Sequence, residues 1–144
     1  MFRTKWLLAT LSTLLMAGGL IIMFVRLNLA FYKDSHIGGA YDSAFDGRFW
    51  KVFFSGSGFY LLGALGLGKF LTARVAIFAG AICAVASIVL YWVPYVVFHA
   101  DFEGWSGAAT TTMALTVLVG GTLTWLIGMI RRSRARSTKL SPHR

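Results

Sequence analysis

The chain has 144 residues, of which 57% are hydrophobic and 13% are charged, and its formal net charge is +9. Soluble domains average about 45–50% apolar and about 25% charged residues, so this composition argues against a soluble globular protein. Charged side chains are absent from four long stretches, 6–25, 52–68, 75–98 and 104–130. A helix needs about 20 predominantly apolar residues to cross a bilayer core. We therefore predict an all-α integral membrane protein with a four-transmembrane-helix bundle and short loops.

The first two predicted helices are separated by a polar connection. We expect these helices over roughly 6–27 and 49–68. Gly-Gly and Asp-Gly dipeptides mark turns between them, and the spacing of Tyr41 and Phe45 favours a short interfacial helix over 40–46. The second helix is rich in glycine, which lets helix backbones approach closely inside a membrane.

The second half of the chain predicts two longer helices and a polar tail. The helices should cover roughly 73–98 and 105–130. Only about four residues, 69–72, precede the third helix, so we expect the second and third helices to form a tight antiparallel hairpin. Residues 131–144 are basic and lack hydrophobic periodicity, which predicts a disordered cytoplasmic tail. Residues 1–130 then form one transmembrane domain.

A stripe of small residues runs along the fourth predicted helix at every fourth position. Its members are Ala108, Thr112, Thr116, Gly120, Thr124 and Gly128. A shorter stripe, Ala76, Gly80 and Ala84, lies on the third helix. Such grooves allow close helix contact, and a four-residue repeat drifts about 40° per step around a helix of 3.6 residues per turn. The partner is either another helix of this chain, a second copy in a homo-oligomer or another membrane protein.

The basic residues are distributed unevenly between the two predicted sides. With the N-terminus inside, ten fall on the inner side with no acid: Arg3, Lys5, Lys69, Arg74, Arg131, Arg132, Arg134, Arg136, Lys139 and Arg144. Four fall outside, with all five acids. The positive-inside rule therefore predicts a bacterial-type cytoplasmic (inner) membrane protein with both termini in the cytoplasm. The basic tail should attract anionic lipids. No nucleic-acid binding is expected, because no aromatic platform accompanies the charge.

One polar group of residues lies at the predicted outer face. His36 belongs to the first outer connection, and His99, Asp101 and Glu103 belong to the second. Imidazoles and carboxylates could ligate a divalent metal such as zinc or act as a general acid/base pair. Their spacing matches no established metal signature, and solvated loop residues are the alternative. We therefore predict no catalytic residue and no cofactor, and treat these four as candidate metal ligands.

No Asp, Glu, Lys, Arg or His lies at mid-depth in the four apolar stretches, although coupled carriers normally need such a group. The single cysteine, Cys83, is expected to pack between helices. These features favour a non-enzymatic accessory, assembly or scaffolding subunit. One alternative is an oligomeric solute-permeation protein whose path is lined by the Thr-rich fourth helix. A third is a membrane enzyme or metal site at the outer loops.

Overall fold

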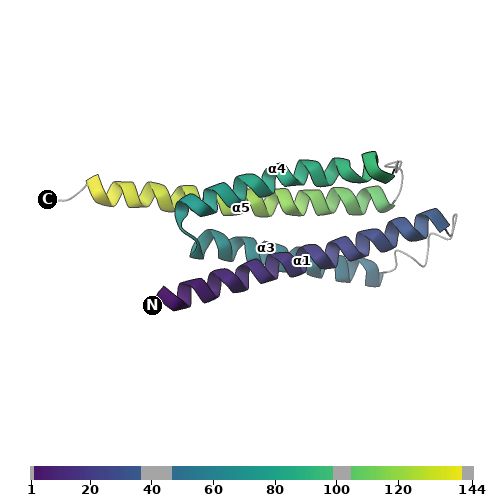
Figure 1. Cartoon of the computed structure of the whole chain (residues 1–144), viewed down its shortest axis with the longest axis horizontal. Coiled ribbons are helices and arrows are strands. Elements are labelled where there is room, and N and C mark those ends of the chain that lie inside the picture. The colour runs from purple at the N-terminus through teal and green to yellow at the C-terminus, as the bar shows by residue number, and fades with distance from the viewer. Residues whose placement is uncertain (1, 37–46, 99–104, 141–144) are drawn as a thin grey trace.

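The computed structural model describes residues 2–36, 47–98 and 105–140, which form four helices and a two-residue link. The helices are α1 (Phe2–His36), α3 (Gly47–Phe70), α4 (Ala73–Phe98) and α5 (Trp105–Leu140) (Figure 1). The all-helical prediction is confirmed for these residues, and α4 has the predicted bounds. The interfacial helix predicted over 40–46 lies outside the described residues.

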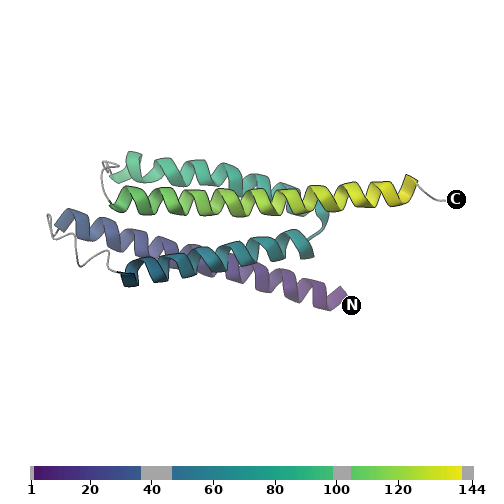
Figure 2. The same ribbon diagram turned by 180° about the vertical axis from the view of Figure 1, so that it is seen from behind.

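The helices alternate in direction. α1 and α4 run one way and α3 and α5 run back, so both termini lie at the same end of the molecule (Figure 1). The link Leu71–Thr72 also lies at this end, whereas the other two breaks between helices fall at the opposite end (Figure 2). We call the end that carries Lys5, Lys69 and Arg131 the basic end.

The helices associate as two pairs, α1 with α3 and α4 with α5, and contacts between α3 and α5 join the pairs. The consecutive helices α3 and α4 touch only sparsely, which corrects the predicted tight hairpin. Glycines explain the choice of partners. A Cβ atom on Gly19 would lie 2.5 Å from the Gly56 carbonyl oxygen, and one on Gly80 would lie 2.6 Å from the Gly121 carbonyl oxygen. Backbones approach this closely only where a side chain is absent.

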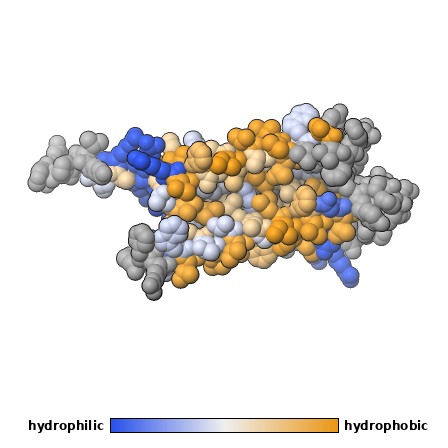
Figure 3. Space-filling view, viewed as in Figure 1, coloured by the Kyte–Doolittle hydropathy of each residue, from blue (hydrophilic) through white to orange (hydrophobic). Residues whose placement is uncertain are grey.

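The core lies between the two pairs. Its largest fully buried side chains include Phe53 and Tyr60 of α3 and Met23 of α1, and they meet Met113 and Val117 of α5. Apolar side chains also cover the outside of the molecule between its two ends (Figure 3). An apolar outer surface is what a lipid environment requires of a helical bundle.

Three helices are long and apolar enough to cross a membrane, with candidate spans Thr4–Leu29 in α1, Ala73–Trp92 in α4 and Gly107–Thr138 in α5. This finding supports a membrane protein. The less apolar α3 is not among the three, because its uncharged stretch is short, contains several glycines and serines, and is flanked by Lys51 and Lys69.

The C-terminal segment differs from its prediction as a disordered tail. α5 continues about ten residues beyond the predicted end and stays helical to Leu140. Arg, Ala, Lys and Leu are good helix formers, and no glycine or proline occurs between Gly128 and Pro142. Extending an existing helix also avoids the cost of nucleation. High charge and a lack of hydrophobic periodicity therefore did not prevent these residues from continuing the helix.

Candidate functional site

The candidate metal ligands of the outer face are not brought together by the described structure. His99, Asp101 and Glu103 lie outside the described residues, and His36 is the last residue of α1, where the side chain is also outside them. Within the described ranges, no group of three or more His, Cys, Asp or Glu side chains could hold a metal ion. The outer-face site stays a prediction.

The small-residue stripe of α5 lies mostly inside the bundle. Thr116, Gly120, Thr124 and Gly128 are buried, whereas Ala108 is exposed. A Cβ atom on Gly120 would meet the Tyr60 ring of α3, and one on Gly128 would meet Ile77 of α4. The stripe thus turns from α3 towards α4 along the helix, as the predicted drift requires.

Most threonine hydroxyls of α5 are satisfied by their own helix. The hydroxyls of Thr111, Thr112, Thr116 and Thr122 each donate to the carbonyl oxygen four residues earlier, over 2.8–2.9 Å. Thr124 shares its hydrogen between the carbonyl oxygens of Gly120 and of Ala64 in α3, at 2.9 and 3.0 Å. Thr122 is exposed whereas Thr116 and Thr124 are buried. These side chains therefore do not form one continuous polar face.

A buried tyrosine that sequence reasoning missed lies at the centre of the bundle. Tyr60 has no exposed surface, and its hydroxyl has no hydrogen-bond partner among the described residues. The Cys83 thiol of α4 lies beside it, and a thiol is only a weak donor or acceptor. A tyrosine in a glycine-rich helix gives no sequence signal that distinguishes this position from the membrane boundary.

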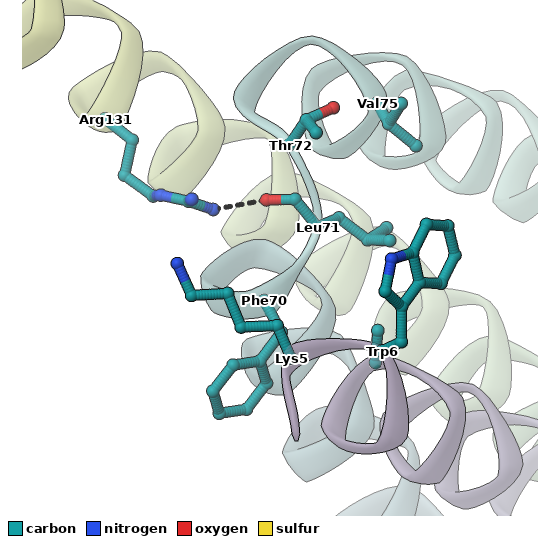
Figure 4. A pocket seen from close by; sticks show the side chains of 8 residues that line it. Lys5, Trp6, Phe70, Leu71, Thr72, Val75 and Arg131 are labelled. Atoms are coloured by element: carbon teal, nitrogen blue, oxygen red, sulfur yellow. Dashed lines mark hydrogen bonds between the residues drawn. The ribbon is translucent and has the colours of Figure 1, made fainter. Parts of the chain in front are cut away.

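A mainly apolar pocket opens at the basic end and has a volume of about 430 Å³. It lies between the start of α1, the α3–α4 link and α5 (Figure 4). Its walls are Trp6, Ala9, Phe70, Leu71 and Val75, with Thr72 at the link, and its two cations are Lys5 and Arg131. The volume is in the usual range for small-molecule sites, about 300–1,000 Å³.

Arg131 holds the link at the rim of this pocket. Its Nη1 donates to the carbonyl oxygen of Leu71 at 2.6 Å (Figure 4) and to that of Gly68, in the last turn of α3, at 2.8 Å. The last carbonyls of a helix lack partners within it, so a cation here both satisfies them and complements the helix dipole. The neighbouring Lys69 ammonium lies 5.6 Å from the centroid of the Phe70 ring.

A second hollow of about 520 Å³ adjoins the pocket at Thr72. It lies between the start of α4 and the extension of α5, and its charged side chains are Arg74, Arg132 and Arg136. We call it the arginine groove. The sequence predicted a basic cluster here but not this shape. Only a helical extension places Arg132 and Arg136, four residues apart, on one face.

Together the pocket and groove combine an apolar hollow with five cations, and no carboxylate, imidazole or thiol is among the described residues that line them. Such a site can bind an anion that carries an apolar part. Comparisons with protein-family models, with curated proteins and with solved structures gave no match.

Proposed function

We propose that this protein is a multi-pass inner-membrane protein that acts as a non-enzymatic accessory, assembly or scaffolding subunit. In this proposal α1, α3, α4 and α5 all cross the bilayer, and both termini lie in the cytoplasm. The orientation is supported by the sequence, in which ten basic residues fall on the predicted inner side and four on the predicted outer side.

The crossing by α3 is supported by its neighbours and its length. α3 packs against both α1 and α5, which are themselves long and apolar enough to span. Its 24 residues extend about 36 Å, compared with a hydrocarbon core of about 30 Å. Two of its polar side chains, Ser57 and Tyr60, are buried in the protein, and the exposed Ser55 hydroxyl donates to the Lys51 carbonyl of its own helix. Burial of this kind permits a less apolar helix to cross.

The observation that carries the accessory role is the closed interior between α3 and α5. Tyr60 packs against Gly120 there, and the buried Thr116 and Thr124 hydroxyls bond to carbonyls of their own helix. A permeation path would need hydroxyls directed into an open passage. The interior therefore favours a structural role over permeation.

A partner helix has most room on α4. Only 17% of the candidate span of α4 is buried, compared with 44% for that of α5. The reason is that α5 is the only one of the described helices that packs extensively against α4. Large apolar side chains such as Phe78, Val85 and Ile88 remain exposed. We propose that a transmembrane helix of another membrane protein packs on this surface.

The test is affinity purification of the full chain from its native membranes in a mild detergent, followed by native mass measurement. We expect a second membrane protein in fixed stoichiometry. Ala81→Trp on the exposed side of α4 should release it, whereas the matched variant Ala17→Trp on α1 should retain it. A homo-oligomer without a second protein, together with solute flux in proteoliposomes, would contradict the proposal and support permeation.

A further inference from the structure

We propose that the basic end binds one phospholipid that carries two phosphates, a lipid of the cardiolipin class. An acyl chain would occupy the pocket walled by Trp6, Leu71 and Val75. One phosphate would lie at the rim between Lys5 and Arg131, and the other in the arginine groove. The two hollows adjoin at Thr72, so one molecule can occupy both.

The apolar hollow indicates an acyl chain. Its wall is formed by aromatic and aliphatic side chains from α1, α3 and α4, and α1 and α4 make no substantial contact with each other. Water in such a hollow would lack the polar partners that ordered water needs. Both Lys5 and Trp6 belong to the end of the candidate span of α1, where headgroups meet the hydrocarbon core. Lipids are the apolar molecules within reach at this depth.

The charges indicate more than one anionic group. Lys5 and Arg131 line the pocket, and Arg74, Arg132 and Arg136 line the groove. All five acids lie within 34–46 and 101–103, far in sequence from each of these cations. No acid near in sequence offsets the five cations, and their mutual repulsion is relieved when an anion lies among them.

Donor geometry at the rim agrees with phosphate binding. Nη1 of Arg131 is occupied by the carbonyls of Gly68 in α3 and Leu71 in the link, which fixes the guanidinium plane and leaves the N–H groups of Nε and Nη2 to bond an anion. The Lys5 ammonium lies on the same side of the pocket as this guanidinium (Figure 4). The groove begins at the N-terminus of α4, where the helix dipole adds positive potential.

This inference rests on the proposed membrane insertion but not on the accessory role, so the two can fail separately. Basic pockets on the cytoplasmic side of membrane helices are known to suit headgroups of several charges. The test uses the full chain purified alone, so neither a partner nor a membrane orientation affects the result.

The experiment is native mass spectrometry of the detergent-solubilised protein with added cardiolipin, phosphatidylglycerol or phosphatidylethanolamine. We expect one cardiolipin to be retained in preference to the other two. Lys5→Gln and Arg132→Gln should each weaken retention about fivefold, the effect expected for one cation near an anionic lipid. The control is Arg134→Gln, because Arg134 lies on α5 but lines neither hollow. An equal loss in the control would show general attraction to anionic lipid and overturn the proposal.

A second pair of variants tests the acyl chain. Val75→Trp should fill the pocket and reduce retention, whereas Val85→Trp on the same helix should not. Both valines are at least half exposed, so neither change should prevent folding. Equal retention by the two variants, or displacement of the lipid by inorganic phosphate alone at matched phosphate concentration, would contradict a lipid site.

Discussion

The close approach of α1 and α3 makes opposite predictions for two adjacent glycines. A Cβ atom added at Gly18 meets nothing within 4 Å. A Cβ atom at Gly19 would lie 2.5 Å from the Gly56 carbonyl oxygen and 2.6 Å from the Tyr60 nitrogen, whereas ordinary contacts begin at 3.4 Å. Because the obstructing atoms belong to the backbone of α3, Gly19→Ala must move the helices apart by about 0.9 Å at the oxygen.

The two variants share the same change in helix propensity, a gain of about 1 kcal/mol for Gly to Ala. Overpacking adds a penalty of about 1–3 kcal/mol to Gly19→Ala alone. We therefore expect Gly18→Ala to be as stable as the wild type or more stable, and Gly19→Ala to be about 1–3 kcal/mol less stable than Gly18→Ala. Reversible unfolding in mixed micelles measures both. Equal stability of the two variants would refute the packing of α1 on α3. If Gly18→Ala were the less stable variant, Gly18 rather than Gly19 would face α3.

Three further changes test other contacts, each by unfolding in detergent unless stated. Gly120→Leu should destabilise the folded protein more than Leu118→Ala, because the added side chain would overlap the Tyr60 ring whereas Leu118 is 40% exposed; equal losses would contradict the α3–α5 contact. Tyr60→Phe should raise stability by about 1 kcal/mol because it removes a buried hydroxyl that has only the weakly bonding Cys83 thiol beside it, and a clear loss would show that the hydroxyl and the thiol form a real hydrogen bond. Arg131→Ala should cost about 2 kcal/mol, since the end of α3 and the link lose two charge-assisted bonds, and it should speed hydrogen exchange at the Leu71 amide, which donates to the Leu67 carbonyl in the same turn; unchanged exchange would rule out this role.

Much of the fold could be predicted because charge and hydropathy mark helix ends directly. Arg74 and the polar stretch that follows Phe98 flank the apolar run of α4, and its predicted bounds, 73–98, are those of the structure. The pairing of helices could not be predicted in the same way. A small-residue stripe indicates close contact but does not name the partner, so the short link wrongly favoured α3 with α4.

The candidate site was less predictable than the fold. The five cations were visible in the sequence: Lys5 precedes the first apolar stretch, Arg74 lies between the second and third, and three arginines follow the fourth, which correctly indicated one basic end. Their arrangement depends on the helical extension of α5, which turns Arg132 and Arg136 towards Arg74. The pocket depends on the separation of α1 from α4, which is a consequence of tertiary packing alone.

The central claim is that the chain crosses the membrane four times, and the number of crossings determines whether the termini share a side. Three crossings, without α3, would place them on opposite sides. The direct measurement uses paired cytoplasmic and periplasmic activity reporters, fused at residue 144 and inserted within 36–46. We predict cytoplasmic activity at residue 144 and periplasmic activity within 36–46. Periplasmic activity at residue 144 would contradict the account.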